Sequence, residues 1–215
     1  VLYVWRPLGG HDPPLNEGLL SDVDRRIPAA WMLAPGFPAD PSACPAVVAG
    51  NVETSQRLGD VLVRAFGLSA CSQGTMNNTI FGNARFSCYE TIGGGAGAGP
   101  GWHGASGVHT HMTNTAITDA EVMELRMPVR VERFALRAGS GGEGRYRGGD
   151  GLERRLRFLE PVSVSLLGQR RVSGPPGAEG GGDGTSGRQW IERATGEVET
   201  LDGVCGVELA AGDVL

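Results

Sequence analysis

Glycine is the residue that most constrains how this chain can fold. The 215 residues include 36 glycines, and these follow no collagen-like period. Because glycine weakens helix interiors and reaches backbone conformations closed to other residues, this content predicts many turns and loops and few long helices. The densest stretch, residues 86–115, holds eight of the glycines together with Glu90 and three of the four histidines.

The composition of that stretch predicts a functional site. Glycine lets a ligand approach the backbone closely, while histidine and glutamate supply proton transfer and metal ligation. His109 and His111 are two positions apart, so in a strand both imidazoles would lie on the same face. We therefore expect Glu90, His109 and His111 to face one cleft as catalytic residues. If the pair binds a metal of unknown identity, Glu90 and His103 are the candidates for a third ligand; the alternative is a hydrogen-bonded structural pair.

Polar residues beside turns and helix starts form a second group of candidates. Asn51 and Thr54 precede a predicted helix, where they would cap it or help its exposed N–H groups to bind an anion or an amide. Asn77 and Asn78 follow a polar turn, and Asn114 follows the paired histidines. Asparagine is an ordinary turn residue, but its side chain also donates to and accepts from an amide. These five residues are the candidates for substrate binding.

Several classes of function are disfavoured by the composition. All 19 basic residues are arginine, which excludes a Schiff-base lysine, a lysine base and a phosphate-loop lysine. The net charge of −5 argues against nucleic-acid and membrane partners. A G-x-G-x-x-G pattern at residues 139–144 opens no helix, so dinucleotide binding is not expected. The four cysteines lack metal-binding spacing, and no signal peptide or long apolar run is seen, which favours the cytoplasm.

The hydrophobic pattern predicts an α+β fold, a strand-rich mixed sheet with few helices. One helix is expected over residues 53–66, with an apolar face that includes Leu58, Val61 and Phe66, and another over 118–126, opened by a capping box from Thr118 to Glu121. Strands are expected over residues 1–6, 46–49, 77–89 with a turn at 82–83, 109–114, 129–136, 152–159, 162–167, 189–193, 197–201 and 204–209. A Pro-rich turn is expected at 12–16 and a glycine-rich loop at 174–187. The apolar start without methionine predicts a fragment of something longer.

Six ordered motifs carry a family resemblance. They lie at residues 14–18 (PLNEG), 50–57 (GNVETSQR), 72–78 (SQGTMNN), 89–98 (YETIGGGAGA), 109–115 (HTHMTNT) and 140–151 (SGGEGRYRGGDG). Together they resemble the hydantoinase B/oxoprolinase family, in particular the C-terminal part of its ATP-dependent 5-oxoprolinases. The similarity is strongest between residues 14 and 158. This chain has Gln169 before Arg170 and Arg171, where relatives tend to carry an acidic residue.

The resemblance implies a role in an ATP-dependent cyclic-amide hydrolase that opens 5-oxoproline to glutamate. Residues 1–215 would be the C-terminal part of a hydantoinase B-type domain, with a motif-rich α+β part at 1–127 and a strand-rich part at 128–215. ATP and Mg²⁺ would be bound by a kinase-like, hydantoinase A-type half that this chain lacks. The ligands of any divalent metal would lie mostly upstream.

The implied partners are a small lactam, the kinase-like half and further copies of the whole enzyme, without nucleic acid or membrane. We expect the segment to be inactive by itself. One alternative is an acetone-carboxylase or hydantoinase-type subunit of the same family. Another is a non-catalytic structural or assembly fragment, in which the histidines and asparagines serve only the fold.

Overall fold

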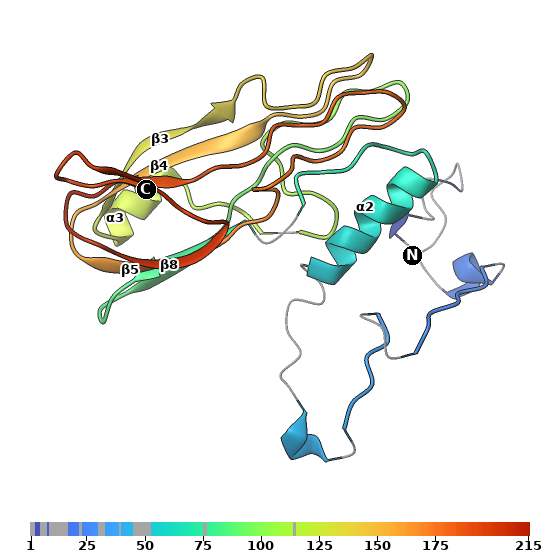
Figure 1. Cartoon of the computed structure of the whole chain (residues 1–215), viewed down its shortest axis with the longest axis horizontal. Helices are drawn as coiled ribbons and strands as arrows, with labels where there is room; N and C mark the ends of the chain where they lie inside the picture. The colour runs from blue at the N-terminus through green and yellow to red at the C-terminus, as the bar shows by residue number, and fades with distance from the viewer. Residues whose placement is uncertain are drawn as a thin grey trace.

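A computed structural model describes residues 3–4, 8, 17–21, 23–29, 33–38, 40–44, 53–74, 77–113 and 115–215 of the chain. In this part the fold is α+β and rich in antiparallel strands, as predicted (Figure 1). Before residue 53 the named elements are two short 3-10 helices, η1 (Glu17–Leu20) and η2 (Pro41–Ala43).

A strand was predicted over residues 1–6. The structure describes two of these residues, Tyr3 and Val4, and both are helical, so the prediction is wrong for them. A short apolar run does not by itself distinguish a strand from a buried helical turn. The turn predicted at 12–16 and the strand predicted at 46–49 lie outside the described residues.

One sheet has four antiparallel strands in the order β2-β1-β5-β8. β1 (Asn78–Gly82) and β2 (Ser87–Thr91) form the predicted hairpin, and the turn is closed by Asn83 N donating to Phe86 O at 3.0 Å. β5 (Val162–Leu167) pairs with the other edge of β1, and β8 (Val204–Leu209) pairs with β5. Both later strands have the predicted bounds.

A second layer faces this sheet. β3 (Val129–Arg137) pairs with β4 (Gly151–Phe158), and β6 (Trp190–Glu192) pairs with β7 (Val198–Thr200). Val214, near the C-terminus, forms bridges to Arg157 of β4 and Glu192 of β6. The C-terminal residues therefore join the two strand pairs side by side.

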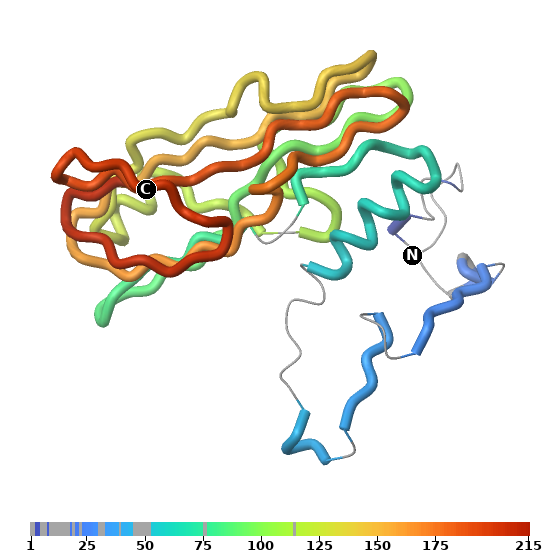
Figure 2. Tube along the Cα trace, in the orientation of Figure 1, coloured from blue at the N-terminus to red at the C-terminus, as the bar shows by residue number. Residues whose placement is uncertain are grey.

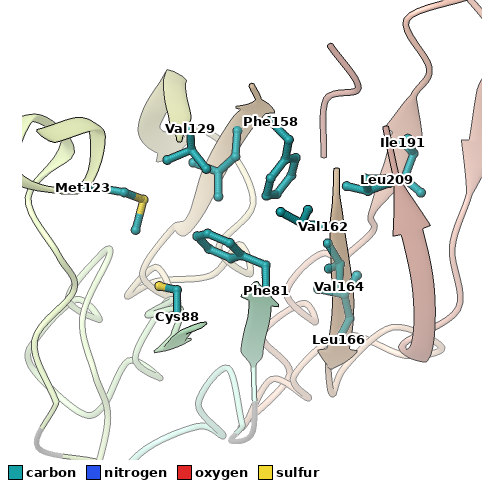
Figure 3. Packing of buried hydrophobic residues seen from close by; sticks show 11 residues of the cluster. Phe81, Cys88, Met123, Val129, Phe158, Val162, Val164, Leu166, Ile191 and Leu209 are labelled. Atoms are coloured by element: carbon teal, nitrogen blue, oxygen red, sulfur yellow. The ribbon is translucent and has the colours of Figure 1, made fainter. Parts of the chain in front are cut away.

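The hydrophobic core lies between the two layers (Figure 3). Alternate residues of β5, namely Val162, Val164 and Leu166, are buried, as the period of a strand with one buried face requires. The rings of Phe81 and Phe158, one from each layer, meet edge to face with centroids 5.3 Å apart. This contact joins β1 to β4 across the core.

Helix α3 (Ala120–Arg126) closes one side of the core with Met123, which is fully buried. Its N-cap is Asp119 and not the predicted Thr118. The Asp119 carboxylate accepts from the backbone N–H groups of Glu121 and Val122 at 3.0 and 3.4 Å. Thr118 is engaged elsewhere, because its backbone N–H donates to Glu90 of β2 at 2.9 Å.

The longer helix, α2 (Ser55–Ala65), was predicted, and Gly67 ends it with a φ of 64°. In the part of the chain that the structure describes, no helix combines the length and apolarity needed to cross a membrane.

The glycine-rich segments run side by side as extended chains outside the named strands, a bundle visible in the tube view (Figure 2). Backbone hydrogen bonds join them: Ala96 N donates to Ala105 O and Gly149 N donates to Ala96 O, both at 2.9 Å. Farther along, Gly182 N donates to Glu143 O at 2.7 Å. We call residues 92–108, 138–151 and 168–187 the glycine bundle.

Close backbone approach explains why glycine occupies this bundle. A Cβ atom on Gly149 would collide with Ala105 O, and one on Gly95 would collide with Gly149 O, both far inside the 3.0 Å that real Cβ contacts respect. The composition predicted turns and loops, but many of these glycines serve packing between neighbouring segments.

We predict that Gly149→Ala lowers the free energy of unfolding by at least about 2 kcal/mol, because the added methyl group overpacks a site walled by backbone. Gly206→Ala is the matched control, since a Cβ at this exposed position of β8 would have its nearest neighbours at 4.0 Å; its effect should stay within about 0.5 kcal/mol. Chemical denaturation of both variants measures the difference. Equal effects of the two substitutions would contradict the packing argument.

Candidate functional site

The buried face of α2 is polar. Its buried residues are Gln56, Gly59, Asp60 and Val63. Val61 and Phe66, expected on a buried apolar face, are 62% and 50% exposed. That expectation is wrong because the polar side chains on the opposite face of the helix form hydrogen bonds with residues that follow residue 109. These hydrogen bonds offset the free-energy cost of burying polar groups.

Gln56 holds the segment that carries the histidines. Its Nε2 donates to Thr110 O at 2.7 Å and to Thr113 Oγ1 at 2.6 Å, and its Oε1 accepts from Met112 N at 2.9 Å. Thr113 N also donates back to Thr110 O at 3.0 Å. The described residues of the predicted 109–114 strand therefore form a turn, and the argument that places both imidazoles on one strand face does not apply to them.

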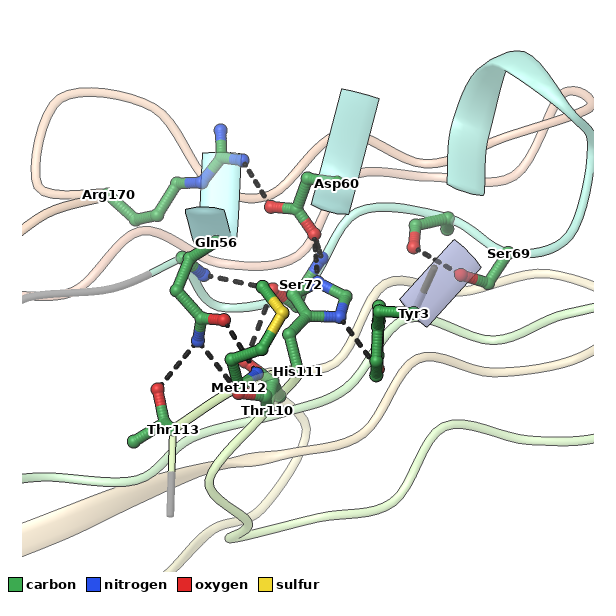
Figure 4. A network of polar contacts seen from close by, with 12 residues as sticks. Tyr3, Gln56, Asp60, Ser69, Ser72, Thr110, His111, Met112, Thr113 and Arg170 are labelled. Carbon is green, nitrogen blue, oxygen red and sulfur yellow. Dashed lines mark hydrogen bonds and ion pairs between the residues drawn. The ribbon is translucent and has the colours of Figure 1, made fainter. Parts of the chain in front are cut away.

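His111 lies on this turn with a φ of 51°, in the left-handed region that residues other than glycine seldom adopt. Its Nε2 lies 2.7 Å from Asp60 Oδ1, and its Nδ1 lies 3.2 Å from the hydroxyl of Tyr3 (Figure 4). The Tyr3 and His111 rings meet edge to face at 5.6 Å. We call Tyr3, His111 and Asp60 the relay.

Asp60 organises the charges of the relay. Only 3% of it is exposed, Ser72 N donates to its Oδ1 at 2.9 Å, and an Arg170 guanidinium nitrogen lies 3.6 Å from its Oδ2. Burial by itself would raise the pKa of Asp60, but hydrogen bonds from His111 and Ser72 outweigh it, so that the pKa lies below its ordinary value. Burial, and then the negative Asp60, raise the pKa of Tyr3.

These protonation states define what the relay can do. An ionised Asp60 only accepts, so His111 presents Nε2–H to it and leaves Nδ1 for the phenol of Tyr3. Tyr3 is 45% exposed. The arrangement therefore connects a buried carboxylate, through an imidazole, to a hydroxyl at the surface, and can pass a proton along that line.

The other two described histidines have different partners. Burial lowers the pKa of His109, whose Nδ1 lies 3.2 Å from Thr115 Oγ1. His103 Nδ1 accepts from Arg147 N at 2.8 Å. Over the ranges that the structure describes, no three His, Cys, Asp or Glu side chains are grouped so as to hold a metal ion.

Glu90 lies in a buried ion pair on β2. It is 6% exposed, accepts from Thr118 N at 2.9 Å, and its other oxygen pairs with the guanidinium of Arg154. Glu90, Asn77 and Asn78 line a cavity of about 1030 Å³, whereas neither His109 nor His111 lines it. The structure thus brings Glu90 together with the two asparagines and places the histidines elsewhere.

Two of the five predicted substrate-binding residues, Asn77 and Asn78, form hydrogen bonds within the protein. Asn77 Nδ2 donates to Gln73 Oε1 at 2.6 Å, and Asn78 Oδ1 accepts from Thr91 Oγ1 at 2.8 Å. Thr54 makes no side-chain capping bond to α2. Asn51 and Asn114 lie outside the described residues.

Sequence reasoning did not identify Tyr3, Asp60 or Arg154 as site residues. For Asp60 a signal existed, since Gln56 and Asp60 are spaced i, i+4 and so share one helix face. Tyr3 and Arg154 carried no such signal, because they meet partners 108 and 64 residues away.

We predict that Asp60→Asn lowers the free energy of unfolding at pH 7 by about 3 kcal/mol, because it leaves Arg170 without its buried counter-charge. Since its folded pKa is lowered, Asp60 stabilises the fold fully above its unfolded pKa of about 4 and loses that effect as pH falls through the folded value. The wild type and the variant should therefore converge in stability as the pH falls below about 4, measured by thermal unfolding across pH. A difference that stays constant with pH would contradict this.

The sequence model of the family Hydantoinase B/oxoprolinase matches residues 1–215. The protein 5-oxoprolinase 1 of Arabidopsis thaliana is 49% identical over 215 residues, which cover 100% of this chain and 16% of that protein. The chain thus spans about a sixth of that relative's length.

Two solved structures share the fold. The crystal structure of the ATP-dependent caprolactamase from Pseudomonas jessenii matches 99% of this chain and 40% of its own, with a TM-score of 0.76 and 21% identity. A nucleotide-free acetone carboxylase matches 68% of this chain and 25% of its own, with a TM-score of 0.55 and 19% identity. The resemblance seen in the motifs is confirmed, and so is the expectation of a segment of a larger domain. The chain belongs to the hydantoinase B/oxoprolinase family.

Proposed function

We propose that this segment serves an ATP-dependent enzyme that opens a cyclic amide, and that the reaction is the opening of 5-oxoproline to glutamate. The observation that carries the proposal is the 49% identity to a 5-oxoprolinase over the whole chain. The relay supports it chemically, because opening a lactam leaves an amine nitrogen that needs a proton.

In this proposal the relay supplies that proton. When His111 is an imidazolium, Nδ1–H donates to the Tyr3 oxygen while the Tyr3 O–H donates to the leaving nitrogen. Asp60 keeps Nε2–H oriented and stabilises the positive ring, as a buried carboxylate beside a catalytic histidine does. The reverse transfers let the same groups accept a proton from an attacking water.

ATP and Mg²⁺ are proposed for the whole enzyme, bound by a kinase-like, hydantoinase A-type half. The described residues do not fit them: they include no lysine and no group of three metal-ligating side chains. We expect no ATPase or lactamase activity from the segment alone. Self-association of the whole enzyme, a cytoplasmic location and the division at residues 127 and 128 stay predictions.

The alternatives within the family are a ketone carboxylase and a hydantoinase-type subunit. The complete enzyme, purified, should release phosphate from ATP in the presence of 5-oxoproline and form glutamate, but should not consume acetone with bicarbonate or open hydantoin. Glutamate formation is measured by chromatography. Carboxylation of acetone without lactam opening would replace the proposal by the carboxylase alternative.

We predict that His111→Ala in the complete enzyme lowers turnover of 5-oxoproline by about 10²–10⁴-fold, the usual contribution of a general acid–base group. Its melting temperature should change little, so that the loss of turnover cannot be explained by unfolding. Kinetics and thermal unfolding on one preparation separate the two effects.

The matched control is His103→Ala, which removes an exposed imidazole that accepts from Arg147 N and lies outside the relay. It should keep near-normal turnover. If His111→Ala instead kept its turnover and melted clearly lower, His111 would have the purely structural role that is the non-catalytic alternative for this segment.

A further inference from the structure

Positive charge exceeds negative charge around the cavity of about 1030 Å³. Eight arginines and five glutamates are among its lining residues. Four of these glutamates are already ion-paired, in the pairs Glu90–Arg154, Glu143–Arg147, Glu153–Arg133 and Glu192–Arg155. Of the cavity arginines, only Arg154, Arg155 and Arg170 take part in ion pairs of the described residues. Five have no carboxylate partner there, and two of these five, Arg137 and Arg171, lie near each other.

Arg171 is held in place by neutral groups. Its Nε donates to Gln189 Oε1 at 2.9 Å and its Nη1 donates to Asn77 Oδ1 at 3.2 Å and to the carbonyl of Gln169. None of the hydrogen bonds of the described residues uses its Nη2. The side chain passes glycines at which a Cβ would come within about 3.0 Å of it: Gly168, Gly187 and Gly203. The guanidinium is thus positioned, and one of its nitrogens, Nη2, is unused.

The side chain of Arg137, on β3, lies near the guanidinium of Arg171. Its Nη1 donates to Ser186 O at 2.8 Å, and Gly187, the next residue, lies against Arg171 Nη1. Burial and the positive charge of Arg137 both lower the pKa of Arg171. Two like charges that share a partly buried place without a counter-ion favour the binding of an anion there.

We propose that Arg137 and Arg171 form an anion-binding subsite that takes the carboxylate of a small molecule in the cavity. Hydrogen bonds from a guanidinium to a carboxylate are charge-assisted and strong. The unused Nη2 of Arg171 can donate to one carboxylate oxygen, and the guanidinium of Arg137, of which only Nη1 is engaged by the described residues, can donate to the other. This subsite is separate from the relay, since His111 and Tyr3 do not line the cavity. It requires no lactam chemistry and does not rest on the proposed function.

The test is equilibrium binding of glutarate to the complete enzyme by calorimetry, with glutaramide as the uncharged analogue and inorganic phosphate as a second oxyanion. Glutarate is expected to bind, and Arg171→Gln and Arg137→Gln each to weaken it at least tenfold. Glutaramide should not bind measurably. Phosphate binding tighter than glutarate would overturn the assignment to a carboxylate.

Control variants distinguish a loss of glutarate binding at this subsite from a general effect of removing a positive charge or of misfolding. Arg130→Gln removes the same charge from an exposed position of β3 outside the cavity and should leave glutarate binding unchanged. If Arg171→Gln does not fold, Arg137→Gln decides the test, with folding checked by circular dichroism. Unchanged glutarate binding in a folded Arg137→Gln variant would overturn the proposal, whether or not the enzyme turns over a lactam. Loss of glutarate binding in that variant would uphold the proposal, again independently of lactam turnover.

Discussion

Backbone packing against backbone in the glycine bundle is the constraint on which the rest of this structure depends. Gly149 lies so close to Ala105, and Gly95 so close to Gly149, that no side chain fits between the segments. This close approach allows backbone N–H and C=O groups to form hydrogen bonds across the bundle, as Gly149 N does with Ala96 O. These backbone groups are therefore hydrogen-bonded even though they lie outside regular strands. These contacts must offset the large conformational entropy that glycine loses when it is ordered.

The bundle also places the relay. Gly94 and Val108 pair through both of their backbone groups, at 2.7 and 2.9 Å, and the chain leaves that pair directly into the turn that bears His111. On the neighbouring segment, Gln73 N donates to Gly95 O at 2.9 Å, while Ser72 N donates to Asp60 of α2. One edge of the bundle thus anchors both the histidine turn and the helix that supplies its carboxylate.

The sequence predicted the parts of the fold that have a side-chain signal. The hydrophobic pattern located β5 and β8, and the periodicity over α2 located that helix. The buried face of α2 could not be predicted, because the partners of Gln56 and Asp60 lie about 50 residues later on an irregular turn. The packing of the glycine bundle could not be predicted for a different reason. Its glycines contact backbone atoms, which every residue has, so the sequence carries no signal for their partners. Glu90 was predicted to face a cleft as a catalytic residue, but its ion pair with Arg154 was not predicted, because Arg154 resembled any other strand arginine.

Asp60 links the relay to the cavity. One of its oxygens accepts from His111, and the other lies 3.6 Å from Arg170, which lines the cavity. Because both contacts are nearly removed from water, the charge of Asp60 is shared between an imidazole that can gain a proton and a guanidinium that cannot. His111 and Arg170 therefore share one buried carboxylate, and a change in either partner alters how well Asp60 is compensated for its burial. This shared counter-charge connects the relay to the wall of a cavity that His111 does not line.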